Sequence, residues 1–289
     1  MRYNQNCKIK IPYESYYFRS MSSTSFIPYK NSQIHFLQFG FGKKLLFAFH
    51  GFSENAESFL VLEPSLGPIY TIIAIDLPYH GNSIWNEPDF FSTNDLIQIF
   101  EIFIETFNVN RFSVLGFSMG GKCALFVAQF FANQMDELLL MASDGIKTNK
   151  LYNVAVYPSW GRSLFKTTIK FPGWFFVFIN VTKKLHLISP WLHKFTHNHM
   201  DTKVKRQRLY DTWISMANFN PDILLVKEKL NKFNISVFLF FGKRDEVIPV
   251  AVGEYFSEGL KIFKLVELDR GHYFIDEKLN PFITKTIIL

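Results

Sequence analysis

The segment GFSMGG at residues 116–121 restricts the possible folds more than any other part of this sequence. It follows a strand-like run that ends in Val114-Leu115 and precedes a run of helical periodicity over 122–129. Glycines on both sides of Ser118 allow a sharp turn in which the serine has a strained backbone and its hydroxyl stands at the carboxyl edge of a sheet. The pattern predicts an accessible serine between a buried strand and a helix. The alternative is a glycine-rich turn whose solvated serine has no chemical role.

Strand-like and helical runs alternate along the first half of the chain. Continuous apolar runs are typical of strands that are covered on both faces of a parallel sheet. Strand-like runs lie at 33–39, 45–50, 70–76, 112–117 and 138–142, and several of them are continuous apolar runs of this kind. Helical periodicity is clearest over 94–107 and 120–133. The alternation predicts an α/β fold with a mostly parallel central sheet flanked by helices.

The alternation stops near Asp144 and resumes with strand-like runs at 236–242 and 262–268. We therefore predict a mainly helical lid at 145–225, inserted after the sixth strand. The core of the fold is expected to comprise 31–144 and 226–289. Residues 1–30 are expected to form an N-terminal extension, to which the sequence assigns no role.

From His50-Gly51-Phe52 to His272, the sequence resembles the α/β-hydrolase superfamily, in particular its lid-bearing esterase, lactonase and C–C hydrolase branch with a serine nucleophile. The motifs occur in the family's order. The DLPYHGNS segment at 76–83 is similar to the family's turn after the next strand. His80 in that turn is interpreted as structural, because no serine or carboxylate is assigned to it. The resemblance implies the α/β-hydrolase fold.

The resemblance also implies a catalytic triad and an oxyanion hole. Ser118 would be the nucleophile, and His272, which follows the last predicted strand, would be the base that takes its proton. The family places the two oxyanion-hole amides on the residues after His-Gly and after the nucleophile, here Phe52 and Met119. Each such donor contributes roughly 3 kcal/mol in well-studied enzymes.

Two aspartates compete for the role of the triad acid. Asp245 lies in GKRDEVIP at 242–249, which resembles the family's acid loop. Asp144 follows the strand-like run 138–142, after which some members of the family carry the acid. Asp245 has the fuller motif and is our prediction, whereas Asp144 is interpreted as a residue at the hinge of the lid.

A serine at the nucleophile position disfavours the dehalogenases and epoxide hydrolases of the superfamily, which carry aspartate there. We predict a carboxylesterase-like serine hydrolase that cleaves an ester, thioester or related acyl bond through an acyl-enzyme. The alternative is a C–C bond hydrolase, or a non-hydrolytic lyase or binding protein of the same fold. No cofactor is expected.

The positive charge of the chain is concentrated in the predicted lid. Residues 145–210 contain 12 Lys and Arg and one acid, Asp201, a net charge of +11 that leaves −5 on the rest of a chain of net charge +6. Many aromatic residues lie between these charges. The combination predicts a small acyl substrate that is anionic or lipid-like, or peripheral contact with an acidic membrane surface. The alternative is a lid whose aromatic residues pack on the core and whose lysines face water.

Other partners are not expected. His193, His197 and His199 have helical spacing, but no carboxylate or cysteine nearby in sequence completes a metal site. The basic cluster at 203–208 lacks a recognised nucleic-acid module. The longest apolar stretch, 171–181, holds 11 residues, against about 20 needed to span a bilayer.

The ends of the chain and its cysteines also allow expectations. The first 20 residues lack the apolar run of a secretory signal, so a cytoplasmic enzyme is expected. Two cysteines, Cys7 and Cys123, cannot form a disulfide framework. Cys123 lies in a predicted core helix and is expected to be a buried free thiol.

Overall fold

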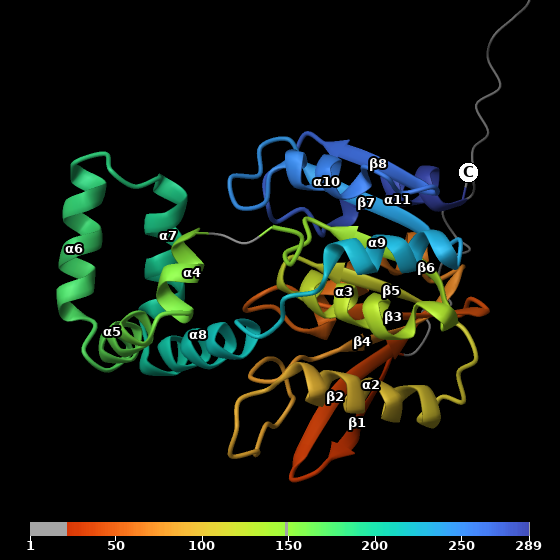
Figure 1. Cartoon of the computed structure of the whole chain (residues 1–289), viewed down its shortest axis with the longest axis horizontal. Coiled ribbons are helices and arrows are strands. Elements are labelled where there is room, and N and C mark those ends of the chain that lie inside the picture. Colours follow the sequence, from red (N-terminus) through yellow and green to blue (C-terminus); the bar gives the residue numbers. More distant parts are fainter. Residues whose placement is uncertain (1–21, 148–149, 289) are drawn as a thin grey trace, which may run out of the picture.

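The structure is a computed structural model that describes residues 22–147 and 150–288. Within these residues, eight strands form one sheet in the order β1-β2-β4-β3-β5-β6-β7-β8 (Figure 1). The pairs β1·β2 and β2·β4 are antiparallel, and every other pair is parallel. The mostly parallel sheet is therefore confirmed. The strands are β1 (Ser23–Tyr29), β2 (Ser32–Phe39), β3 (Lys44–Phe49), β4 (Tyr70–Ile75), β5 (Phe112–Phe117), β6 (Met135–Met141), β7 (Ser236–Gly242) and β8 (Phe263–Leu268).

Helices cover both faces of the sheet, as the continuous apolar runs require. The larger hydrophobic cluster joins one face of the sheet to α2 (Thr93–Thr106), α3 (Met119–Phe131), α9 (Ile223–Lys232) and α10 (Val250–Ser257). The other face packs against η1 (Ala56–Leu62), α1 (Glu63–Leu66), η3 (Glu277–Leu279) and α11 (Asn280–Ile283). The last described element is η4 (Thr284–Ile288). Every residue of β5 is buried between the two layers.

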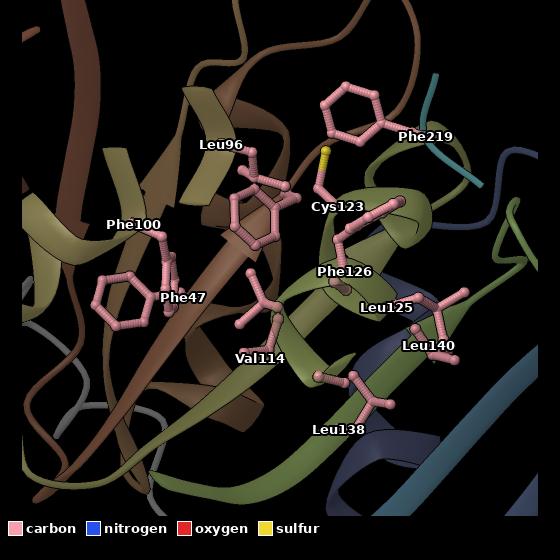
Figure 2. Packing of buried hydrophobic residues seen from close by; sticks show 14 of the residues in the cluster. Phe47, Leu96, Phe100, Val114, Cys123, Leu125, Phe126, Leu138, Leu140 and Phe219 are labelled. Atoms are coloured by element: carbon pink, nitrogen blue, oxygen red, sulfur yellow. The ribbon is translucent and has the colours of Figure 1, made fainter. Parts of the chain in front are cut away.

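The larger cluster is rich in phenylalanine, which here fills the core. Phe47 of β3 contacts Phe100 and Phe103 of α2 edge to face, with ring centroids 4.8 and 5.9 Å apart. Figure 2 shows this packing around Phe47, Phe100 and Cys123. Cys123 is a buried free cysteine, as expected, and burial raises the pKa of its thiol to about 12. Cys7 lies outside the described residues.

The sheet begins earlier than the sequence indicated. Ser23–Tyr29, within the expected N-terminal extension, forms β1 and pairs with β2 along its whole length. Only Ile27 and Tyr29 of this strand are buried, so its apolar pattern is too short to predict a strand. The strand lies at the edge of the sheet, where Pro28 is tolerated. Residues 1–21 lie outside the described part of the chain.

Six described helices lie between β6 and β7, and the last of them, α9, packs on the sheet. The first five are α4 (Lys150–Val156), α5 (Ser159–Lys170), α6 (Gly173–Lys184), α7 (Pro190–Met200) and α8 (Lys203–Met216). We call them the helical insertion. Figure 1 shows them to one side of the sheet, with α6 the most distant. They have small apolar clusters of their own, one of which includes Ile169, Met200 and Leu209. Local caps fix the helix starts, since the side chains of Ser189 and Thr202 accept the Leu192 and Lys205 amides.

Candidate active site

Ser118 lies at the turn between β5 and α3, with φ 48° and ψ −118°. This is a strained conformation for a residue other than glycine, and backbone hydrogen bonds hold it. The Ser118 amide donates to the Met141 carbonyl at 3.0 Å, and the Ser118 carbonyl accepts the Gly121 amide at 2.9 Å. A Cβ at Gly120 would lie 2.0 Å from the Phe49 carbonyl oxygen, so only glycine fits where α3 passes the end of β3. The sharp strand-to-helix turn expected from the sequence is present.

His272 and Asp245 are brought to Ser118 from the loops after β8 and β7. Nε2 of His272 lies 2.9 Å from Oγ of Ser118, and Nδ1 lies 2.7 Å from Oδ2 of Asp245. Oδ1 of Asp245 accepts the amides of Val247 and Ile248 at 2.7 and 2.9 Å, which orients the buried carboxylate. With its proton on Nδ1, the imidazole can accept the Ser118 proton on Nε2. The three side chains predicted to act together are therefore in one hydrogen-bonded chain.

Asp144, the alternative acid, is placed elsewhere. Its Oδ1 accepts the Gly145 amide at 2.7 Å, and its Oδ2 lies 3.5 Å from Nζ of Lys122. The Asp144 amide donates to the Ser118 carbonyl at 2.9 Å, so the residue supports the turn through its backbone. The carboxylate that contacts His272 is that of Asp245.

The two residues expected to form an oxyanion hole both line the cavity above Ser118. Met119 is the first residue of α3, and the amides of a first helical turn have no partner within the helix. Phe52 follows Gly51 in the loop after β3, and this loop also borders the cavity. Two such amides can stabilise an oxygen that becomes negative during a reaction.

The cavity has a volume of about 430 Å³, which is large enough for a small ligand. Ser118 and His272 lie in its wall beside apolar residues of the sheet domain, such as Val247 and Ile248. The helical insertion supplies much of the remaining wall. Its lining residues come from α4, α7 and α8, namely Tyr152, Leu192, Phe195, Thr212, Trp213 and Met216.

Lys122, which the sequence analysis did not select, also lines this cavity. It is only 2% exposed, and its Nζ donates to the Met216 carbonyl at 3.3 Å. The same ammonium lies 4.6 Å from the ring centre of Tyr152, a cation–π contact. The sequence contained a signal for this residue, because Lys122 is the lone lysine in the otherwise apolar run 119–128. A buried charge of this kind needs partners.

Glu54 is a second residue that the sequence analysis missed. One of its carboxylate oxygens accepts the Gly51 amide at 3.2 Å, beside the proposed oxyanion loop. Burial raises the pKa of this carboxyl to about 7, and the hydrogen bond from Gly51 and the nearby His272 charge oppose that rise. The signal was a carboxylate three residues after Gly51, although the sequence alone does not show that it is buried.

Three histidines outside this hydrogen-bonded chain contact oxygen atoms elsewhere in the protein. His80 is buried with Nδ1 3.0 Å from the Pro78 carbonyl, and burial together with His50 lowers its pKa to about 3. His193 and His197 both contact Oδ1 of Asn180, at 2.9 and 3.1 Å. In the part of the chain that the structure describes, no group of three His, Cys, Asp or Glu residues is arranged to hold a metal ion.

A serine on a strand-to-helix turn of a mostly parallel sheet, paired with a histidine after the last strand, is the arrangement of the α/β hydrolases. A family model described as alpha/beta hydrolase fold matches residues 44–279 of this chain. The chain therefore belongs to the α/β-hydrolase family.

Similar proteins of this family include hydrolases from bacteria. The chain is 23% identical over 251 residues to the uncharacterized hydrolase YugF of Bacillus subtilis, covering 85% of this chain and 89% of that protein. It is 25% identical over 237 residues to pimeloyl-[acyl-carrier protein] methyl ester esterase of Neisseria meningitidis, covering 79% and 86%. A thermophilic esterase from Thermogutta terrifontis has a similar structure, with a TM-score of 0.66, 16% identity and coverage of 92% and 97%.

Proposed function

We propose that this hydrolase cleaves an ester or thioester through an acyl-enzyme on Ser118. The observation that carries the proposal is the continuous hydrogen-bonded chain from Ser118 through His272 to Asp245. A serine hydroxyl is a weak nucleophile until a base accepts its proton, and His272 lies at the distance required. The similarity to an enzyme named as a methyl ester esterase supports the same bond type.

The proposed reaction has two halves. Oγ of Ser118 attacks the carbonyl carbon while its proton passes to Nε2 of His272, and the carbonyl oxygen becomes negative between the Phe52 and Met119 amides. His272 then gives the proton to the leaving alcohol or thiol as its bond to the carbonyl carbon breaks. Water attacks the acyl-enzyme in the second half, with His272 again as base, and releases the acid and free Ser118.

We further propose that the helical insertion acts as a lid. It supplies Phe195, Trp213 and Met216 to the cavity wall, which gives the acyl group an apolar environment next to Ser118. Excluding water from this space would strengthen the hydrogen bonds to the reacting oxygen.

The experiment that tests the proposal is labelling by a fluorophosphonate probe, followed by hydrolysis of p-nitrophenyl esters of graded acyl length. The parent should be labelled and should turn over these esters. Ser118→Ala should not be labelled and should lose several orders of magnitude of kcat, with little change in its thermal unfolding. A Ser118→Ala enzyme that retains half the parent's activity would overturn the proposal. Labelling without ester turnover would instead favour the C–C hydrolase, lyase or binding alternative.

A further inference from the structure

Helix α6 has an apolar stripe exposed to solvent. Trp174, Val177, Phe178, Val181 and Leu185 are spaced so that they share one face of the helix, which ends at Lys184 with Leu185 as its C-cap. They are 45%, 65%, 54%, 50% and 60% exposed. We call these five residues the α6 stripe.

The stripe is not the face that packs on the rest of the protein. Ile179 and Thr182 are buried on another side of α6, and Phe175 and Phe176 pack on the apolar cluster of the insertion. That side contacts α7, and α6 is the helix farthest from the sheet (Figure 1). The stripe therefore faces outward at the end of the molecule, and folding does not explain its apolar character.

Exposed apolar residues continue beyond both ends of the stripe, and basic residues accompany them. Phe171 and Leu187 are 60% and 70% exposed. Lys170 precedes Phe171 with its Nζ 5.3 Å from the ring centre, and Lys184 is exposed at the end of the helix. Asp201, the single acid among residues 145–210, is already paired with Lys205 at 2.9 Å.

In the described part of the chain, Lys170 and Lys184 form no ion pair with an acid. An exposed apolar face beside such lysines matches the surface of an anionic bilayer, which is negative at the headgroups and apolar beneath them. A second copy of this chain fits less well, because two segments of charge +11 would meet and repel each other. No helix in the described ranges is long and apolar enough to cross a membrane. The 12 residues of α6 extend about 18 Å, well short of a bilayer core of about 30 Å.

We propose that α6 docks on the surface of an anionic lipid bilayer, with the α6 stripe in the boundary between headgroups and acyl chains. Helix α7 lies against α6 and also supplies Leu192 and Phe195 to the cavity. Docking would thus place a lipid surface one helix away from the wall of the cavity. The substrate class that follows, a lipid-borne ester, rests on the proposed function, whereas docking itself does not.

The test measures binding without turnover, in the Ser118→Ala protein, by co-sedimentation with vesicles of phosphatidylcholine alone or mixed with phosphatidylglycerol. The protein should bind the mixed vesicles more tightly. Trp174→Gln/Phe178→Gln/Val181→Gln should weaken that binding by about a hundredfold or more, because three side chains lose apolar burial. The matched control is Phe41→Gln/Phe130→Gln/Leu224→Gln, which removes apolar residues exposed elsewhere and should bind like its parent.

A charge variant gives a second, independent measurement. Lys170→Gln/Lys184→Gln leaves the stripe intact and should reduce the preference for the anionic vesicles. Absence of binding to mixed vesicles, or equal binding by the stripe variant, would overturn the proposal. A stripe-dependent dimer in analytical ultracentrifugation would also overturn it, in favour of a second copy. Failure of the proposed function is recognised separately, as vesicle binding by a protein that hydrolyses no ester.

Discussion

The ammonium group of Lys122 lies 3.5 Å from the carboxylate of Asp144, although Lys122 belongs to the helix that starts at the Ser118 turn. The same ammonium contacts Met216 of α8 and Tyr152 of α4. One buried charge therefore connects α3 with both ends of the helical insertion. It also gives Asp144 a partner, which explains how two aspartates after neighbouring strands come to have different environments.

Replacing each aspartate by asparagine should separate these roles. Asp245→Asn should lower kcat by about 10⁴, since an amide cannot hold His272 in the tautomer that accepts the Ser118 proton. Asp144→Asn should change kcat much less, because its side chain contacts Lys122 and the Gly145 amide. Steady-state kinetics on one activated ester would compare them. The opposite order of the two variants would assign the acid to Asp144.

Glu54 should make the folded state less stable as pH rises. Its folded pKa of about 7 is above the ordinary value of 4.5, so its stabilising protonated form is fully present below pH 4.5 and is lost as pH rises through 7. Between pH 4.5 and pH 7 the free energy of unfolding should fall by up to about 3 kcal/mol. Glu54→Gln should remove this dependence.

Thermal unfolding of the parent and of Glu54→Gln from pH 5 to pH 8 would measure the effect of Glu54. The variant should gain stability relative to the parent as pH increases over this range. Parallel curves for the two proteins would show that the Glu54 carboxyl does not change its charge on folding.

Two basic residues of α8 should differ in their effect on stability. The Arg206 guanidinium donates to the carbonyls of Ile169 and Met200 at 3.0 and 2.8 Å, which ties α8 to the ends of α5 and α7. Arg206→Gln should lower the free energy of unfolding by about 1–3 kcal/mol, because these carbonyls lose charged donors. Lys203→Gln, at an exposed position, should have little effect. Equal unfolding midpoints in urea would contradict the structural role of Arg206.

The exposed lysines of the insertion should favour anionic over neutral esters at low salt. Attraction over more than a Debye length weakens as salt rises, so the ratio of kcat/KM for matched anionic and neutral esters should fall as salt increases to about 0.5 M. Lys166→Gln/Lys184→Gln/Lys194→Gln/Lys203→Gln should show the high-salt ratio at every salt concentration, with kcat nearly unchanged. A ratio that salt and these substitutions leave constant would show that the lysines are only a solvated surface.

The parts of the fold that the sequence predicts well are those whose signals are local. The apolar run of β5 and the glycines around Ser118 specify a strand, a turn and a helix within a few residues. The residues that bring Asp245 and His272 to Ser118 act over long separations, and there the family resemblance supplied the prediction.

The features that the sequence did not predict depend on tertiary contacts. β1 is defined by its pairing with β2, since only its last residues are buried. The burial of Glu54 and Lys122 depends on which segments cover them. Helix α6 is apolar on several faces, so periodicity cannot tell its packed face from its exposed one.

The insertion separates the chain into one part that carries Ser118 and another that carries Asp245 and His272. Proteolytic cleavage within the insertion would yield two fragments, neither of which would contain Ser118 together with Asp245 and His272. The fragments would remain joined by the five paired positions of β6 and β7, from Glu137 opposite Ser236 to Met141 opposite Phe240, and by the cores on both faces of the sheet. Activity of the cleaved protein would thus show that two separate polypeptides still share one sheet. Mixing the two purified fragments could then restore the site.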